Sequence, residues 1–276
     1  MSSDAGMKGR VTVDELRGLA EGFVSGRGGP GGQTGWWGSP LLVSAALDDR
    51  FRLLPTIAAS DHLLPWELLP SAKAVVAFFI PFLVHLTREN AHGEVPCRNW
   101  GIAYVETNEL ISALCLGLQE HLGGAGYRSV FAPPTHNFDP ASLTSRWSHK
   151  HLAYLAGLGR FGHNAQLITP KGCAGRLGSL VTEADLGDSP IVGNGEACLH
   201  RFGEDCLECV ERCPVGALSK AGLDRRRCWA RLRWNREESG AMDGLPENTH
   251  VCGKCTVMLP CSHVDPAARR IGGHGS

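Results

Sequence analysis

The sequence lacks a long hydrophobic run. Its longest apolar stretch, residues 74–86, is shorter than the ~20 residues that a membrane-spanning helix needs, and Pro81 interrupts it. The N-terminal sequence MSSDAGMKGR is not followed by the apolar segment of a secretion signal. We therefore predict a soluble, cytoplasmic protein that makes no contact with membranes.

An excess of charge of one sign is also missing. Lys and Arg number 27 against 28 Asp and Glu, which gives a net charge of -1. This balance creates no general attraction to nucleic acid or to acidic membranes. Internal repeats are absent too, and the one low-complexity segment, residues 26–38, holds seven glycines and Pro30. It has no Gly-Lys-Ser/Thr ending and follows no predicted strand, so it favours a mobile or ligand-facing loop over a phosphate-binding loop.

Cysteine, by contrast, is abundant. Eight of the eleven cysteines fall between residues 198 and 261. Because thiols in a reducing compartment do not persist as disulfides, such a dense group indicates bound metal. The segment CLECVERCP ends with Cys213 directly before Pro214, the step by which ferredoxin-type chains direct one cysteine to a second cluster. Eight thiolates suffice for two 4Fe–4S clusters, which predicts a function in electron transfer.

The order of the cysteines sets their expected pairing. By the ferredoxin rule, Cys213 binds a different cluster from the cysteines just before it. The loop between Cys198 and Cys206 is longer than in ferredoxins, and His200 within it is an alternative ligand. Two four-thiolate zinc sites, or a set of inert thiols, are the other interpretations, and iron and sulfide content distinguishes them. The predicted ligands are Cys198, Cys206, Cys209 and Cys261 for the first cluster and Cys213, Cys228, Cys252 and Cys255 for the second.

The rest of the chain predicts helices and strands in an α+β or α/β fold. Hydrophobic residues make up 43% of the sequence, which is enough for a packed core. Thr12 and Glu15 have capping-box spacing at the start of a helix, and leucines every four residues predict an amphipathic helix over 106–122. Continuous apolar residues predict a central strand, buried on both faces, at 73–80. The other expected elements are a strand at 128–132, a helix at about 145–158, and short strands near Leu167 and Leu180.

Three segments together resemble a known family. They are AGLGRFGHN at residues 156–164, GCAGRLGSLVTEADL at 172–186, and the cysteine order described above. Their combination resembles the epoxyqueuosine reductase family, to which the reductive dehalogenases are related, over about residues 70–262. The resemblance implies that residues 1–192 form an α/β domain, similar to nitroreductases and flavin reductases, that holds cobalamin. A ferredoxin-like domain at residues 193–265 would then deliver electrons through two 4Fe–4S clusters to cobalt, and residues 266–276 would form a tail.

The same resemblance implies a set of cofactor-binding residues. His163 stands where the family usually has lysine, and Cys173 replaces a serine, so Cys173→Ser is expected to spare both clusters and change only cofactor spectra or activity. Glycine in such motifs lets the backbone approach a flat ligand, although a turn that needs glycine for its own geometry explains the motif equally well. The implied cobalamin-binding residues are Gly157, Leu158, Gly159, Gly162, His163, Asn164, Gly172, Cys173, Leu177 and Gly178.

Two departures from the family concern the substrate. The family's proposed proton donor is an aspartate that would fall near Leu143 and Thr144, where this sequence has none. The chain also ends soon after Cys261 without the helical repeats that help longer members to hold tRNA, so tRNA is not expected as a substrate. The alternative proton donors, each of which also has a structural interpretation, are Tyr104, Tyr127, His136, Asp139 and His149.

Three functions are consistent with these features. The first is a cobalamin-dependent reductase that passes electrons from a low-potential ferredoxin- or flavodoxin-type donor through two clusters to a small substrate. The second, favoured by the missing aspartate, is a non-catalytic electron carrier that reduces a corrinoid protein or another partner. The third is an iron–sulfur flavoprotein that binds FMN. The arginine-rich stretch 225–236 either docks an acidic donor or RNA, or raises the potential of the cluster bound through Cys228.

Overall fold

A four-stranded sheet forms the centre of the molecule. The computed structural model describes residues 8–27, 35–135, 137–191 and 195–268. The strands follow the order β1–β2–β8–β3, with β1 at Leu41–Ala46, β2 at Ala74–Pro81, β8 at Gly175–Thr182 and β3 at Ser129–Phe131. Every pairing among these strands is antiparallel. The sheet therefore fits the α+β class rather than an α/β class built on parallel strands.

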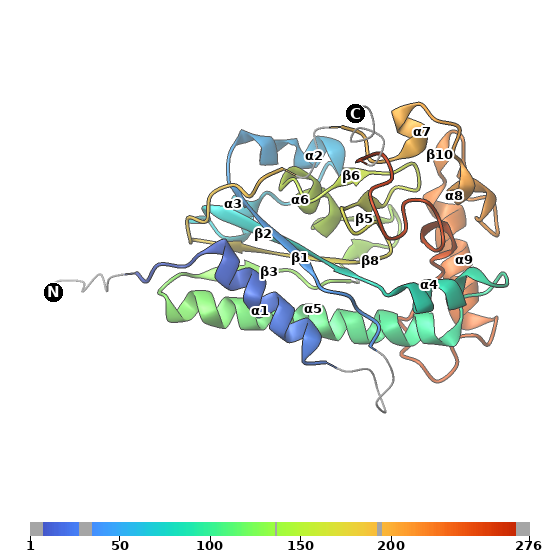
Figure 1. Ribbon diagram of the computed structural model, residues 1–276, viewed down its shortest axis with the longest axis horizontal. Coiled ribbons are helices and arrows are strands. Elements are labelled where there is room, and N and C mark those ends of the chain that lie inside the picture. The colour runs from blue at the N-terminus through green and yellow to red at the C-terminus, as the bar shows by residue number, and fades with distance from the viewer. Residues whose placement is uncertain (1–7, 28–34, 136, 192–194, 269–276) are drawn as a thin grey trace, which may run out of the picture.

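Strand β2 is buried along its whole length, as its apolar sequence predicted. Successive side chains of a strand point to opposite faces of the sheet. Val76, Phe78 and Ile80 pack into one hydrophobic cluster, and Val75, Ala77 and Phe79 pack into another on the opposite face. The sheet is thus covered on both sides, and Figure 1 shows the two layers of helices that cover it.

Helices α1 (Val13–Ser25) and α5 (Arg98–Gly124) cover one face of the sheet (Figure 1). The predicted capping box of α1 is present between Thr12 and Glu15. The leucines that predicted the amphipathic helix are fully buried in α5. However, α5 begins at Arg98 rather than near residue 106, because its first turns bury Trp100 and Ala103 against residues close to the C-terminus.

Shorter helices cover the opposite face. Helix α6 is shorter than the predicted helix at 145–158, because residues before it form the hairpin β4–β5. Next to α6, the two-stranded pair β6–β7 begins within the first glycine motif, and its second strand confirms the short strand predicted near Leu167. The bounds are η2 Asp49–Leu53, α2 Leu54–Ile57, α3 Pro65–Leu68, β4 Phe138–Asp139, β5 Thr144–Ser145, α6 His149–Leu155, β6 Arg160–Phe161 and β7 Leu167–Ile168.

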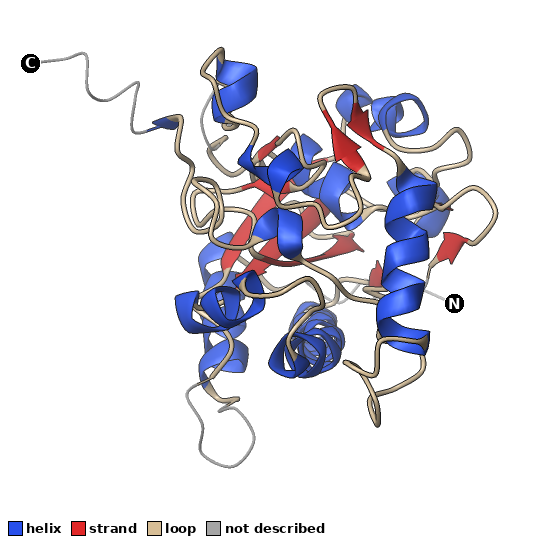
Figure 2. Cartoon of the chain, turned by 90° about the vertical axis from the view of Figure 1, so that its right-hand side faces the viewer, coloured by secondary structure: helices blue, strands red, loops and turns tan. Residues whose placement is uncertain are grey.

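The cysteine-rich segment packs against one end of the sheet. Figure 2 views the molecule from this end and shows mostly loops and short helices around the longer helix α9. Met242, Val251 and Val257 from this segment share a hydrophobic cluster with Trp100 of α5, so its loops rest on the first part of the chain. The bounds within this segment are α7 Leu199–Phe202, α8 Glu208–Glu211, β9 Leu218–Ser219, β10 Gly222–Leu223, α9 Arg225–Glu237 and η3 Lys254–Thr256, and helix α4, at Val84–Ala91, lies between β2 and α5 in the sequence.

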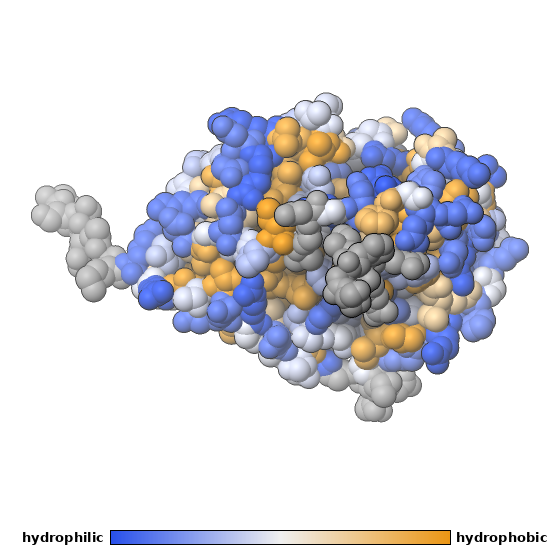
Figure 3. Space-filling view, turned by 45° about the horizontal axis from the view of Figure 1, so that its top comes forward, coloured by the Kyte–Doolittle hydropathy of each residue, from blue (hydrophilic) through white to orange (hydrophobic). Residues whose placement is uncertain are grey.

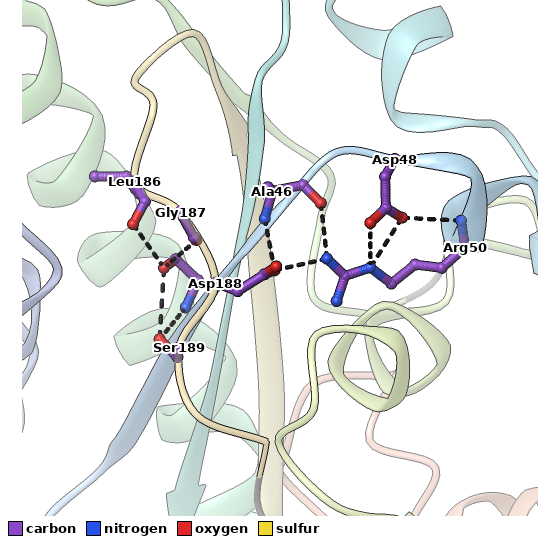
Figure 4. Close-up of polar contacts among 8 residues, drawn as sticks. Ala46, Asp48, Arg50, Leu186, Gly187, Asp188 and Ser189 are labelled. Carbon is purple, nitrogen blue, oxygen red and sulfur yellow. Dashed lines mark hydrogen bonds and ion pairs between the residues drawn. The ribbon is translucent and has the colours of Figure 1, made fainter.

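The outer edge of the sheet is covered by the chain that follows β8. The backbone N–H of Ser44 in β1 donates to the hydroxyl of Ser189 at 2.9 Å, and the Ser189 N–H donates to the Ser44 carbonyl at 2.8 Å. Beside them, Arg50 bridges Asp188 at 2.6 Å and Asp48 at 2.9 Å (Figure 4). This network covers backbone groups of an edge strand that would otherwise stay open to pairing with another chain.

The surface is mixed in polarity. On the face drawn in Figure 3, small groups of apolar residues lie between polar ones. The most exposed large apolar side chains among the described residues include Leu53, Leu116 and Ile191, which belong to separate parts of the chain. In the described ranges no helix combines the length and the apolar character that crossing a membrane requires.

Candidate functional site

The four cysteines predicted for the first cluster lie around one small cavity of about 20 Å³. They reach it from three segments, because Cys198 precedes α7, Cys206 and Cys209 flank the start of α8, and Cys261 follows η3. Gly162 and Asn164 of the first glycine motif also line this cavity. The structure therefore brings together side chains that are far apart in the sequence, in the grouping that the cysteine order predicted.

The four cysteines predicted for the second cluster line a larger cavity of about 290 Å³. Cys213 follows α8, Cys228 lies in the first turns of α9, and Cys252 and Cys255 stand on either side of the turn that opens η3. In that turn Gly253 has φ of +75°, and a Cβ there would lie 2.4 Å from the Trp100 ring. Only glycine allows this turn and its contact with α5, which set the positions of both cysteines.

Burial raises the pKa of several of these thiols and so favours their protonated form in the absence of a cation. Burial, followed by the neighbouring Cys261 and Cys198, raises the pKa of Cys209 to about 12. Burial, followed by Cys252 and Cys213, raises the pKa of Cys228 to about 11. Four thiolates in one such space repel one another and need a cation to balance their charge. Nevertheless, no group of three or more His, Cys, Asp or Glu side chains in the described ranges is arranged to hold a metal ion, so the ligand sets stay predictions.

The charge around the larger cavity is positive. Arg176, Arg231 and Lys254 belong to its lining, which contains no Asp or Glu among the described residues. The Lys254 ammonium is buried and donates to the carbonyls of Asn90 at 2.7 Å and His92 at 2.8 Å. Cations beside an anionic cluster stabilise its reduced form and raise its potential. This cavity therefore suits anionic occupants.

An arginine and a tyrosine form the wall opposite the second set of cysteines. The Arg176 guanidinium lies over the ring of Tyr104, 4.4 Å from its centroid, and donates to the Asn108 side-chain oxygen at 2.7 Å. Burial lowers the pKa of Arg176, because the guanidinium has lost most of its water. Tyr104 also lines an adjoining cavity of about 270 Å³, together with Cys228 and Leu143 of the β4–β5 hairpin. Tyr104 therefore borders both cavities, as does Cys228 of the second set.

The other predicted proton donors lie elsewhere. Asp139 is exposed on the hairpin directly opposite Thr144, and its carboxylate accepts from the backbone N–H groups of Ala141 at 2.9 Å and Ser142 at 2.7 Å. These bonds, that of Ser142 first, lower the pKa of Asp139 and favour the carboxylate over the acid. Tyr127 packs beside α5, with the Lys8 ammonium 4.9 Å from its ring centroid, and His136 lies outside the described residues.

His149 is held in the interior. Its Nδ1 accepts from the Ser179 hydroxyl at 2.8 Å and its Nε2 donates to the Pro133 carbonyl at 3.1 Å, with the tautomer inferred from these partners. Burial lowers the pKa of His149 to about 4, which keeps the ring neutral at ordinary pH. None of the cavities described here has His149 in its lining. The contacts assign it a role in holding α6 to the sheet.

The residues predicted to bind cobalamin do not share one cavity. Cys173 lines the larger cavity, whereas His163 and Asn164 line the smaller one. A Cβ at Gly159 would lie 2.3 Å from the Ile168 carbonyl oxygen, and one at Gly178 would lie 2.3 Å from the Phe78 ring. Protein atoms therefore fill the space beside these glycines. The same holds for Gly157, which faces Ile191, Gly162, which faces Asn164, and Gly172, which faces Ser262, while Leu158 is buried and Leu177 is half-buried in β8.

Sequence reasoning missed most of the cavity wall. Phe82, Trp100, Arg176 and Lys254 line the larger cavity but carry no motif. One signal was available, because Arg176 is the one charged residue in the fully paired strand β8. A charged side chain in such a strand has to face a partner or a cavity.

Comparison with known proteins places this arrangement in a fold. No model of a protein family and no curated protein matches the sequence. An epoxyqueuosine reductase solved with an epoxyqueuosine-modified tRNA stem loop matches 90% of this chain with a TM-score of 0.54 and 17% identity. The chain has the epoxyqueuosine reductase fold. The family resemblance predicted from the sequence is thereby confirmed at the level of the fold.

Other solved structures match the fold of this chain as well. The epoxyqueuosine reductase from Streptococcus thermophilus matches 91% of this chain with a TM-score of 0.52 and 17% identity. A catabolic reductive dehalogenase, in complex with 3-bromo-4-hydroxybenzoic acid, matches 73% with a TM-score of 0.52 and 19% identity. This chain spans 66% and 64% of the length of two epoxyqueuosine reductases and 28% of the dehalogenase. The epoxyqueuosine reductase fold thus accounts for most of this chain, while the larger proteins contain further segments.

Proposed function

We propose that this protein is an iron–sulfur oxidoreductase with two 4Fe–4S clusters. The observation that supports this proposal is the division of eight cysteines into two groups of four, each around its own cavity. The donor set consists of thiols, as iron–sulfur clusters require. The grouping also follows the interleaved order of ferredoxin-type chains, which zinc ribbons do not use.

The positions of the two cavities support one direction for electron transfer. The second cluster would border the larger cavity with Tyr104 and Arg176, whereas the first would lie near the surface helices α7 and α8. Asn164 links the two sites, because it lines the first cavity and its side-chain N–H donates to the Cys255 carbonyl at 2.8 Å. An external low-potential donor would therefore reduce the first cluster, and the electron would leave from the second.

The resemblance to the epoxyqueuosine reductase family suggests cobalamin as the electron acceptor in the larger cavity. Cobalamin, when bound, would supply a low-potential metal centre for reducing a small substrate. The residues of this chain would bind and orient the acceptor, exclude water with Phe82 and Trp100, and present the Tyr104 hydroxyl as a proton source. The residues predicted to bind cobalamin do not share one cavity. The geometry therefore supports an electron path only as far as the larger cavity.

Asp139 is a second candidate proton donor. In the Bacillus subtilis epoxyqueuosine reductase, a catalytic loop with an aspartate has been seen swung out of the active site. Here Asp139 is on the β4–β5 hairpin, whose residues Phe138 and Leu143 line the cavity next to Cys228. Asp139→Asn should then lower turnover without changing cluster content, whereas an electron carrier would show no change in either quantity.

A non-catalytic electron carrier is the second candidate function. It is favoured by the lack of Asp and Glu in the described lining of the two cavities that contain Tyr104 and Cys228. Helix α9 offers a docking surface, since Arg225, Arg226 and Arg227 are exposed, while Arg231 and Arg236 bind backbone carbonyls of other segments. A stable complex with a corrinoid protein, without turnover of small molecules, would support this function.

One anaerobic preparation separates these alternatives. Iron, sulfide, cobalt, zinc and flavin are quantified per chain after reconstitution, and the optical spectrum is recorded before and after reduction. We expect about eight iron and eight sulfide atoms per chain, as two cubane clusters require. Bound zinc without sulfide would refute the proposal. Uptake of cobalamin would establish the reductase, whereas a flavin spectrum would favour the iron–sulfur flavoprotein.

A further inference from the structure

A ninth cysteine lies between the two predicted cluster sites. The Cys173 sulfur is 3.9 Å from the Cys261 sulfur of the first set, and Cys173 also lines the larger cavity with the second set. Its side chain is 5% exposed. The family resemblance suggested that Cys173 faces a cofactor, whereas the structure places it against a predicted cluster ligand.

The backbone holds the two cysteines face to face. The Cys173 N–H donates to the Cys261 carbonyl at 2.9 Å, and the Ala174 N–H donates to the Ser262 carbonyl at 2.9 Å. At Gly172 φ is +76°, and a Cβ would lie 2.3 Å from the Ser262 carbonyl carbon. Two parallel hydrogen bonds and a contact that only glycine permits therefore fix the distance between the sulfur atoms.

The neighbours of Cys173 indicate which of the two thiols donates in the Cys173–Cys261 hydrogen bond. The Asn164 side-chain N–H points at the Cys173 sulfur at 3.7 Å, so this sulfur accepts from one side. A cysteine that binds a cluster is a thiolate, which has no proton to donate. When Cys261 binds the first cluster, the S–H group of Cys173 is therefore the donor and the Cys261 sulfur the acceptor.

We propose that Cys173 is a positioning residue that raises the potential of the first cluster by donating an S–H hydrogen bond to the Cys261 thiolate. Hydrogen bonds to cluster sulfurs stabilise the reduced, more negative state. The first cluster would then accept an electron from the donor more readily. The inference rests on the proposed function, because it requires that Cys261 binds an iron–sulfur cluster.

Redox titrations followed by EPR test this inference. The potentials of both clusters are measured in the wild type and in the Cys173→Ala and Cys173→Ser variants. Cys173→Ala should shift one cluster to a more negative potential and leave the other unchanged. Cys173→Ser keeps a hydroxyl donor, so the potential of this cluster should stay close to the wild-type value. Cys115→Ala, at a buried cysteine in the core between α5 and the sheet, is the matched control and should change neither potential.

The outcomes separate this inference from the proposed function. Unchanged potentials in Cys173→Ala, at full iron content, would refute the hydrogen bond alone. Loss of iron from Cys173→Ala would show that Cys173 is a ligand, which also refutes it while the proposed function stands. A wild-type protein that takes up no iron and sulfide would overturn both.

Discussion

Cysteine position decides what each thiol can do in this protein. Cys115 faces the core between α5 and the sheet, where burial raises its pKa to about 12, whereas Cys255 faces the larger cavity with the three other cysteines of the second set. The residue type is the same and the surroundings differ. A thiol surrounded by carbon is inert, whereas a thiol grouped with three others is a candidate ligand.

Cys255→Ser should therefore remove one cluster. We expect iron to fall to about half, because the remaining cysteines of the second set no longer complete four thiolates. Iron and sulfide analysis with EPR of the reduced protein measures the effect. Cys115→Ser makes the same chemical change outside both cavities and should keep full iron content. Equal iron loss in both variants would contradict the assignment.

His149 should make stability depend on pH. Its folded pKa of about 4 lies below the usual 6.5, so between these values the unfolded chain binds a proton that the folded chain does not. The contribution of His149 to the free energy of unfolding is fully present above about pH 6.5 and is lost as the pH falls toward 4. The loss should reach about 2 kcal/mol at pH 5, measured by anaerobic urea unfolding. His149→Gln should flatten this slope, and an unchanged slope would refute a buried neutral histidine.

At the scale of secondary structure, the sequence predicted the elements with a clear period or a continuous apolar run. Strand β2 and the leucine-bearing part of α5 were predicted because their burial follows from local pattern. Strand β1 was missed, although LLVSAA is an apolar run, and the start of α5 was missed because its first turns pack against distant loops. Local patterns cannot report a partner that lies over a hundred residues away.

Glycine substitutions test whether the second motif serves packing. Gly172→Ala places a Cβ 2.3 Å from the Ser262 carbonyl carbon at a positive φ of +76°. We expect a loss of roughly 2–4 kcal/mol in the free energy of unfolding. Gly93 also has a positive φ, +64°, but an added Cβ there meets nothing within 4 Å. Gly93→Ala should therefore cost only about 1 kcal/mol, and equal losses would contradict a packing role for Gly172.

At the scale of the molecule, the cysteine-rich segment depends on the rest of the chain. Its helices α7 and α8 have four residues each, and its strands β9 and β10 have two. Such short elements do not persist alone. Packing of Met242, Val251 and Val257 against Trp100 holds the segment on the rest of the chain, and the proposed clusters would add to its stability.

Removal of the clusters should therefore unfold this segment locally. After anaerobic chelation, limited proteolysis with mass spectrometry should find new cleavage between residues 198 and 262, while the sheet stays protected. The physical reason is that thiolate-to-metal bonds supply folding free energy that the short elements lack. A sample treated with metal-saturated chelator is the control. Unchanged cleavage would show that the segment folds without metal.

The sequence by itself determined the number, order and chemistry of the cysteines, and therefore the capacity for two clusters, because ligand spacing on a loop is a local property. It also determined the buried strand and the amphipathic helix. Only the tertiary structure decided which side chains face those cysteines. Tyr104 of α5 and Arg176 of β8 meet in one wall, and Cys173 lies beside Cys261, because packing of the loops on the sheet brings distant segments together.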